Sequence, residues 1–434
     1  MTYDMKRKCF CALALSATVA LAVFADGWRN AQERREIERS GSVFHSYEFE
    51  PVVDTPAPEG YKPFYVAHYG RHGSRRLTDS FVADTLAAME KAEASAALTE
   101  KGKALLADVR KIADAHDGMI GQLTERGAEE HRLLARRMAE RFPQVFVGSR
   151  RVRCQSSVYP RVLVSQANFT MSLKGAAPGL EFDFAAGDKI QKVIHGAHWA
   201  WKGAKKGADV NKATGDYAKS AIDPKPLVRR LFLSDGAAGD ELKFARNLFA
   251  CASICQCLRT ELAGLDIYRY FANDEIAALG RALAVGHYAK MGASKEFGDT
   301  LLRCLPSLAR DFAERAEEAI ADGRIAADLR FGHDNGLWPF VGFLEIVGPG
   351  NRVPFADSWR ECPAWKWMPM ASNLQIVLYA REGRGSRDRN DVLVKILYNE
   401  REMAVGGLKP VSSGVYYAWK DLAAKLAQKS KTSL

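Results

Sequence analysis

Short apolar runs that end in glycine or polar residues alternate along the chain with longer stretches of helical spacing. The run KPFYVAHYG (62–70) predicts a buried strand that ends at Gly70, and SRRVRCQSS (149–157) predicts a second strand. Residues 79–116 have a helical composition, and Thr124 is a predicted N-cap for a further helix. Strands alternating with helices are typical of α/β proteins.

A long helical block separates these elements from further strand-like runs. From about 185 to 325 the chain is rich in Lys, Ala and Leu at helical spacing, and apolar runs return at 328–334, 373–380 and 391–400. We therefore expect one discontinuous α/β domain with an inserted, mostly α-helical cap. The predicted boundaries are a leader at 1–25, a lead-in at 26–60, the core at 61–184 and 326–425, and the cap at 185–325.

The N-terminus has a pattern of its own. Lys6, Arg7 and Lys8 precede the apolar run CFCALALSATVALAVFA, which ends at the small residue Ala25 before Asp26. A basic segment, an apolar run of about 17 residues and a small-residue site predict a cleaved export signal. We therefore expect a periplasmic or secreted protein, with an uncleaved membrane anchor as the alternative.

The composition says more about the class of ligand than about the fold. With 47% hydrophobic and 26% charged residues the chain is typical of globular proteins, and its formal charge of +10 favours an anionic ligand. There is no basic stripe with interleaved aromatic residues, so nucleic acid is not expected. Six cysteines follow the leader, and the group CASICQC (251–257) predicts small side chains packed on a helix face, with a disulfide as the alternative. The oligomeric state stays open.

The clearest candidate site is RHGSR (71–75), which directly follows the first predicted strand. Like charges repel at this spacing, so Arg71 and Arg75 indicate that an anion binds between them. Guanidinium groups match pairs of phosphate oxygens, which favours phosphate. A neutral imidazole among such cations can attack phosphorus, which makes His72 a candidate nucleophile.

A second candidate segment, FGHDNGLWPF (331–340), also follows an apolar run. His333 could donate a hydrogen bond to the phosphate, and Asp334 could protonate the leaving oxygen as general acid. The alternative for Asp334 is a helix N-cap.

RHGSR (71–75) and GHD (332–334) resemble the paired signatures of the histidine acid phosphatases, the branch of the histidine phosphatase superfamily that contains phytases. The resemblance extends over about 60–420 and includes LTERG (123–127) and QSSVYPRVLVS (155–165). The segment PEGYKPFYVAHYGRHGSR looks closest to bacterial relatives of multiple inositol-polyphosphate phosphatase. The resemblance implies a phosphoglycerate-mutase-like α/β core with the helical cap inserted.

The resemblance also implies a reaction. An exported phosphomonoesterase would act on a polyanionic small molecule, with inositol polyphosphates such as phytate expected and a phosphohistidine formed on His72. Asp334 would be the acid, and no metal or other cofactor is implied. The implied phosphate-binding residues are Arg71, Arg75, His333 and a further arginine, for which Arg161 fits the motif and Arg153 is a nearby substitute on the strand. A broad-specificity acid phosphatase and a non-catalytic anion-binding domain are the alternatives.

This sequence departs from the family pattern at three places. Leu77 stands where proline is common, and Gln155 stands where many acid phosphatases have an arginine. Asp334-Asn335 replaces the Ala-Glu that follows histidine in many inositol-polyphosphate phosphatases. These departures leave the subfamily and the preferred ester open. The lysines of WKGAKKG (201–207) either extend the basic pocket or lie on a solvated loop.

Overall fold

The computed structural model describes residues 31–195, 205–381, 388–411 and 414–431, and it divides the chain into two compact units, Met1–Arg39 and Ser40–Leu434. In the first unit the described part is one helix, α2 (Ala31–Arg39), in which Arg34 and Glu38 form an ion pair of 3.1 Å. The predicted leader lies outside the described residues. All other elements belong to the second unit.

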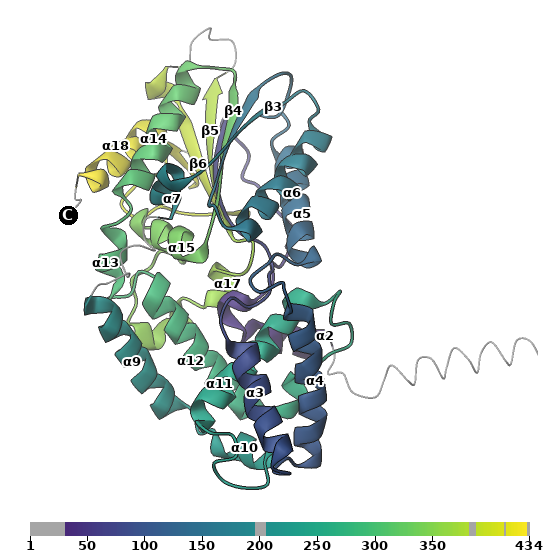
Figure 1. Ribbon diagram of the computed structural model, residues 1–434. Coiled ribbons are helices and arrows are strands. Elements are labelled where there is room, and N and C mark those ends of the chain that lie inside the picture. Colours follow the sequence, from purple (N-terminus) through teal and green to yellow (C-terminus); the bar gives the residue numbers. More distant parts are fainter. Residues whose placement is uncertain (1–30, 196–204, 382–387, 412–413, 432–434) are drawn as a thin grey trace, which may run out of the picture. The chain divides into compact units, whose positions relative to one another are not determined.

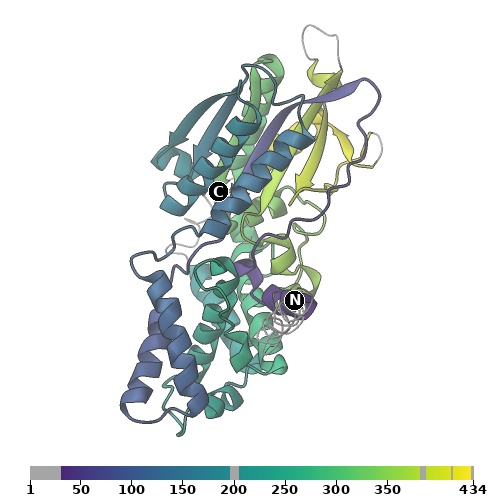
Figure 2. The same ribbon diagram turned by 90° about the vertical axis from the view of Figure 1, so that its right-hand side faces the viewer.

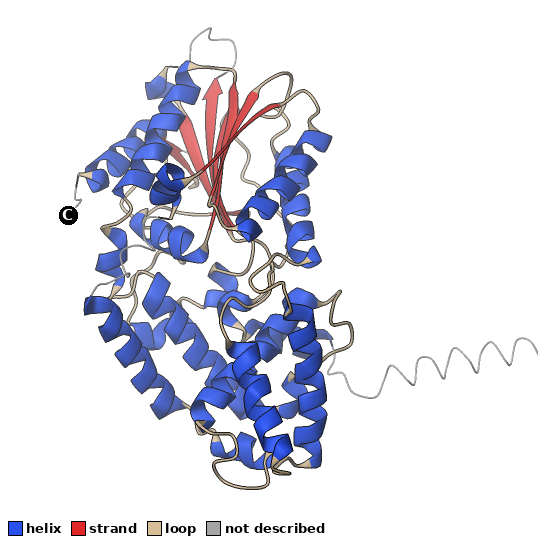
Figure 3. Cartoon of the chain, viewed as in Figure 1, coloured by secondary structure: helices blue, strands red, loops and turns tan. Residues whose placement is uncertain are grey.

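An eight-stranded mixed sheet lies in one part of the second unit, at the top of the view (Figures 1 and 3). The strand order is β3-β2-β4-β1-β5-β6-β7, with β8 paired to β6. The first four strands in this order are parallel, and β5 runs antiparallel to both β1 and β6. The strand bounds are β1 (Tyr61–Arg71), β2 (Arg151–Ser156), β3 (Glu181–Ala186), β4 (Ile325–Gly332), β5 (Asn373–Arg381), β6 (Leu393–Tyr398), β7 (Arg401–Glu402) and β8 (Tyr416–Ala418).

The predicted α/β fold class is confirmed, and five predicted strands correspond to β1, β2, β4, β5 and β6. Of these, β1, β4, β5 and β6 carry apolar runs because they lie in the sheet interior, where β4 is buried along its whole length, whereas β2 alternates buried and more exposed side chains. The sequence analysis missed β3, which is an edge strand with mostly exposed side chains and so carries no apolar run.

Helices cover both faces of the sheet (Figures 1 and 2). On one face lie α5 (Glu125–Arg141) and α6 (Pro160–Ala176), and on the other lie α7 (Asp188–Ile194), α14 (Pro306–Ala321) and α18 (Trp419–Ser430). An apolar core fills the space between α5, α6 and the sheet, where Met138 and Phe169 pack with Val152 and Leu329. As predicted, Thr124 caps α5, its side chain accepting a hydrogen bond from the Gly127 backbone.

Most of the remaining helices form a helical lobe, which draws on two separate stretches of the chain (Figure 1). Its members are α3 (Phe81–Ala94), α4 (Glu100–His116), α9 (Lys205–Ala221), α10 (Lys225–Leu231), α11 (Glu241–Ile254), α12 (Asn273–Met291) and α13 (Gly298–Leu302). Although α3 and α4 precede β2, they pack on α11 and α10. By contrast, α14 lies within the predicted cap segment (185–325) but packs on the sheet. The helical lobe and the predicted cap segment therefore do not coincide, and the cap boundaries at 185 and 325 stay a prediction.

Two further observations concern membrane spans and the cysteines. Within the described ranges, no helix is long and apolar enough to cross a membrane. The six cysteines that follow the leader are all free thiols, and Cys251 and Cys257 are completely buried around the end of α11. Their environment agrees with packing rather than a disulfide.

Candidate active site

Three parallel strands end side by side and bring the predicted site residues to one edge of the sheet. Arg71, at the end of β1, pairs in register with Gly332, at the end of β4. The His72 backbone N–H donates to the Gly332 carbonyl at 3.0 Å, and the Ser157 N–H, just after β2, donates to the Phe331 carbonyl at 3.0 Å. Ligands of α/β sheets bind at this carboxyl edge.

The loop after β1 is held against the start of α5 by backbone contact. A Cβ atom at Gly73 would lie 2.4 Å from the Gly127 carbonyl oxygen, and one at Gly127 would lie 2.1 Å from the Ser74 carbonyl oxygen. Both glycines are therefore required by the close approach of the two segments. The buried Glu130 carboxylate accepts hydrogen bonds from the Ser74 backbone at 2.7 Å and from its hydroxyl at 2.8 Å. The RHGSR loop is thus fixed in place.

His72 is held in one neutral tautomer. Its Nδ1 lies 2.9 Å from the Gly73 carbonyl oxygen. A carbonyl can only accept, so Nδ1 carries the proton and Nε2 keeps its lone pair. The pKa of His72 is well below its usual value, because the ring is buried and lies among cations; these are Arg71, Arg161 and Arg75.

Three arginines, which we call the site arginines, surround His72: Arg71, Arg75 and Arg161. Arg71 is the last residue of β1, Arg75 lies in the following loop, and Arg161 lies in the first turn of α6. Arg71 Nη1 donates to the carbonyls of Val43 and Met368 at 2.7 and 2.9 Å, which fixes its direction. The Nε atoms of Arg75 and Arg161 are buried and find no hydrogen-bond acceptor among the described residues.

The site arginines carry more positive charge than their surroundings balance. Burial, followed by Arg161 and Arg71, lowers the pKa of Arg75 to about 10. Burial also lowers the pKa of Arg161. Among the described residues the one carboxylate that ion-pairs with them is Asp334, whose Oδ2 lies 2.7 Å from Arg71 Nη2. Such an arrangement suits an anion with several oxygens.

His333 and Asp334 occupy the turn from β4 into α15 (Asp334–Phe343). His333 is the N-cap residue and Asp334 is the first helical residue, so the alternative of Asp334 as the N-cap is not what the structure shows. The His333 ring centroid lies 5.6 Å from that of His72, and its Nε2 lies 2.9 Å from Ser157 Oγ. Burial alone would raise the pKa of Asp334, but Arg71 and Arg75 hold it below its usual value.

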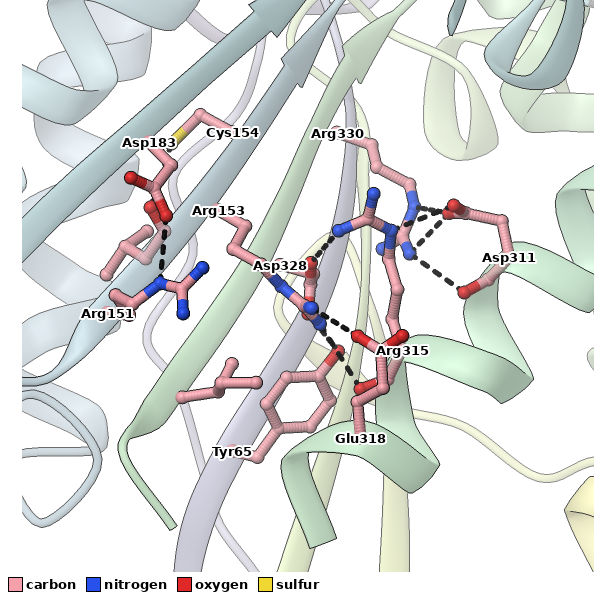
Figure 4. A network of polar contacts seen from close by, with 12 residues as sticks. Tyr65, Arg151, Arg153, Cys154, Asp183, Asp311, Arg315, Glu318, Asp328 and Arg330 are labelled. Atoms are coloured by element: carbon pink, nitrogen blue, oxygen red, sulfur yellow. Dashed lines mark hydrogen bonds and ion pairs between the residues drawn. The ribbon is translucent and has the colours of Figure 1, made fainter. Parts of the chain in front are cut away.

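The structure does not bring Arg153 to this cluster. Arg153 projects from the middle of β2, where its Nη2 lies 2.6 Å from Asp328 and its Nη1 pairs with Glu318 (Figure 4). Of the two candidates for the further phosphate-binding arginine, only Arg161 lies beside His72. Figure 4 shows Arg153 within a larger network with Arg315, Arg330 and Asp311.

Two aromatic side chains beside His333 were not assigned from the sequence. The Tyr159 ring meets His333 edge-on at 5.1 Å between centroids, with the Arg161 guanidinium 4.9 Å from the Tyr159 ring. His195, directly after α7, stacks on His333 at 4.2 Å. Tyr159 lies within the motif QSSVYPR, which offered a signal, whereas His195 lies in no motif. Only the fold brings α7 back to this edge.

Two other features considered from the sequence are a metal site and the lysines of WKGAKKG. The described side chains contain no group of three or more His, Cys, Asp or Glu residues placed to bind a metal ion. Of the lysines of WKGAKKG, Lys202 lies outside the described residues, and α9 begins at Lys205.

Comparison with known proteins agrees with this geometry. Residues 68–218 match the family described as histidine phosphatase superfamily (branch 2). The resemblance to the histidine phosphatases is confirmed. The expected enzyme class, a phosphatase of this superfamily, is confirmed with it.

Solved structures extend the similarity of fold over most of the chain. The multiple inositol polyphosphate phosphatase of Bifidobacterium longum, in complex with inositol hexasulfate, is 21% identical with a TM-score of 0.75; the match covers 90% of this chain and 98% of that one. Its complex with phosphate matches equally well, at 21% identity and a TM-score of 0.75. The phytase from D. castellii is 15% identical with a TM-score of 0.69, covering 94% of this chain and 90% of that one. A search of curated proteins found no match.

Proposed function

We propose that this histidine phosphatase hydrolyses phosphate monoesters through a phosphohistidine formed at Nε2 of His72. The observation that carries the proposal is the tautomer of His72. Its Nδ1 donates to the Gly73 carbonyl, so Nε2 keeps a lone pair on a ring that lies among the site arginines. An anion-binding protein would need the arginines but not this arrangement of the imidazole.

In the first step, the site arginines and His333 would donate hydrogen bonds to the phosphoryl oxygens. Nε2 of His72 attacks phosphorus, and the bond to the ester oxygen breaks. Asp334 gives its proton to that oxygen, so that the alcohol leaves uncharged. The pKa of Asp334 is low beside Arg71 and Arg75, but a bound phosphoryl group would raise it, because its negative charge opposes ionisation of the carboxyl group.

In the second step, water would attack the phosphohistidine, with Asp334 now accepting a proton from the water. The bond from phosphorus to Nε2 breaks, inorganic phosphate forms, and His72 returns to its neutral tautomer. The charge that develops on the phosphoryl oxygens is balanced throughout by the site arginines.

The deciding experiment combines a substitution with a trap. His72→Ala should abolish turnover while leaving the unfolding transition intact. In the parent enzyme, quenching into alkali during turnover should capture phosphate bound to His72, identified by peptide mapping, and brief acid treatment should release it. Substantial turnover in His72→Ala would disprove the nucleophile.

For the substrate, we propose inositol polyphosphates. The support comes from the fold shared with an inositol polyphosphate phosphatase and a phytase, and from the excess charge of the site arginines. The test is a panel at acidic pH that compares inositol hexakisphosphate, a sugar phosphate and a simple aryl phosphate. Similar kcat/KM values for all three would instead indicate a broad acid phosphatase.

We also propose that the enzyme is exported. The basic residues, the apolar run and the small-residue site of the first 25 residues support this. Expression of the full chain followed by cell fractionation and N-terminal sequencing tests the proposal. A mature N-terminus at Asp26 outside the cytoplasm is expected, whereas an intact Met1 in the membrane fraction would show an anchor.

A further inference from the structure

The His195 side chain stacks on His333, one of the predicted phosphate-binding residues. Its ring and the His333 ring are stacked with centroids 4.2 Å apart and planes inclined by 25°. Tyr159 meets the His333 ring edge-on at 5.1 Å. The end of α7 is fixed to β1, because the Tyr69 hydroxyl donates to the Ile194 carbonyl at 2.5 Å. His195 is therefore held against His333 by the fold.

A chain of hydrogen bonds fixes the protonation of His195. The Val158 backbone N–H donates to Gln191 Oε1 at 3.2 Å, so the amide NH₂ of Gln191 faces His195 Nδ1, at 2.9 Å. An amide NH₂ can only donate, so Nδ1 of His195 is unprotonated and Nε2 carries the hydrogen. Nε2 then donates to Asn335 Oδ1 at 2.6 Å. His195 is thus neutral, with both nitrogens engaged.

The same chain reaches the proposed general acid. The Asn335 backbone N–H donates to Asp334 Oδ1 at 2.8 Å. His195 therefore contacts His333 through its ring face and is connected to Asp334 through Asn335. A neutral ring makes both connections without placing another cation beside the site arginines.

We propose that His195 is a positioning residue that sets the orientation of both His333 and Asp334 for phosphoryl transfer. This rests on the proposed function of the site. A histidine suits the task because its flat ring stacks on His333 while its two nitrogens are anchored by Gln191 and Asn335. Phenylalanine would keep the stacking and lose both anchors.

The test is a double-mutant cycle with His195→Phe and Gln191→Leu. The measured quantities are kcat/KM for a phosphate ester and the Kd for inorganic phosphate. We expect His195→Phe to lower kcat/KM by roughly 10–100-fold, the cost of small misplacements in an active site. Gln191 acts through His195, so the double variant should be no worse than His195→Phe alone, whereas independent roles give additive losses.

His131→Phe is the matched control. His131 is another buried histidine, with its ring 5.9 Å from Phe331 on β4 and outside the chain from Gln191 to Asp334. Its variant should keep turnover close to that of the parent, and its effect should add to that of His195→Phe. Additive losses for His195→Phe with Gln191→Leu, or a His195→Phe enzyme within about twofold of the parent, would overturn the proposal.

Nuclear magnetic resonance of the parent enzyme tests the geometry without turnover. The ring ¹⁵N signals of His195 should report the neutral Nε2–H tautomer, and an imidazolium at His195 would overturn the proposal. Because this measurement uses the parent enzyme, it tests the proposal even if the His195→Phe variant does not fold. A parent that binds phosphate without turnover would disprove the proposed function, while the cycle in phosphate Kd would still decide the role of His195.

Discussion

Two groups of three arginines lie beside the central sheet, and they differ in the number of carboxylates that pair with them. The site arginines share one carboxylate, Asp334, within the described residues. The second group, which we call the sheet arginines, consists of Arg153, Arg315 and Arg330, and it pairs with three carboxylates: Asp311, Glu318 and Asp328 (Figure 4).

The pKa values of Arg75 and Arg161 in the first group are lowered, whereas those of Arg153 and Arg315 in the second group are raised. Burial lowers the pKa of Arg75 to about 10, and the other site arginines add to the effect. Burial also acts on Arg153, but Asp328 and Glu318 outweigh it and raise its pKa. The pKa of Arg315 is likewise raised by Asp311 and Asp328, which outweigh burial. Burial is thus common to both groups, and the carboxylates decide the direction.

We propose that this difference separates structural charge from functional charge. Buried cations matched by carboxylates hold α14 to β2 and β4, whereas buried cations without a match must be balanced by a ligand. Position agrees with this division, because Arg153 and Arg330 project from within strands and the site arginines lie at the carboxyl edge. The predictions below test the division, beginning with the largest expected effect.

The first prediction compares one carboxylate from each group. Asp334 and Asp311 are each 17% exposed, and each pairs with a buried arginine. Asp334→Asn should slow the hydrolysis of alkyl phosphates by about 10²–10⁴-fold, because their alkoxides need a proton, and should slow activated aryl phosphates far less. Asp311→Asn should leave both rates per folded molecule close to those of the parent. Equal slowing of both esters by Asp334→Asn would indicate damaged phosphate binding instead of a lost acid.

The second prediction reverses the roles, with stability as the readout. Asp328 is 2% exposed and is shared by Arg153 and Arg315. Asp328→Asn should lower the free energy of unfolding by about 3–5 kcal/mol, because it leaves buried cations unpaired. Arg75→Met, by contrast, should leave stability unchanged or raise it, since it relieves repulsion among the site arginines. Urea unfolding of the two variants measures the contrast, and a larger loss in Arg75→Met would contradict it.

One side of this division could be predicted from the sequence, because local motifs place Arg71, Arg75 and Asp334. RHGSR and GHD each follow a buried strand, so their place at the carboxyl edge follows from strand order and periodicity. The α/β class followed from the same pattern. Thr124 could be predicted as a cap because capping depends on neighbouring residues alone.

What the sequence analysis missed depends on contacts between distant segments. The sequence could not decide which of Arg153 and Arg161 belongs to the site. Arg153 is held by Asp328 and Glu318, and both of these lie more than a hundred residues away along the chain. His195 was missed for the same reason, since its partner Asn335 is 140 residues distant. In both cases the missing information was which distant side chain satisfies a charge or a hydrogen bond.

The third prediction decides between those two arginines by function. Arg161→Met should reduce kcat/KM by roughly 10²–10³-fold, the usual cost of removing one donor to a developing negative charge. Arg153→Met should leave turnover per folded molecule unchanged and lower stability, because Asp328 would lose one partner. Steady-state kinetics on protein shown to be folded by circular dichroism makes the comparison. Comparable losses of kcat/KM in the two variants would mean that charge in the sheet also governs the site.

The last and smallest expected effect is the response of stability to inorganic phosphate. A ligand that binds only the folded state stabilises it by mass action, by about 2.7 kcal/mol at 100 times its Kd. Phosphate should bind the site arginines and leave the sheet arginines untouched, because the latter are already paired. The parent and Asp328→Asn should therefore gain the same stability at a given saturation, although Asp328→Asn starts from a lower value. Arg161→Met should gain much less at the same phosphate concentration, because its Kd is raised. Thermal unfolding in phosphate against chloride of equal ionic strength separates binding from general screening. An undiminished gain in Arg161→Met, or a lost gain in Asp328→Asn, would place the bound anion among the wrong arginines.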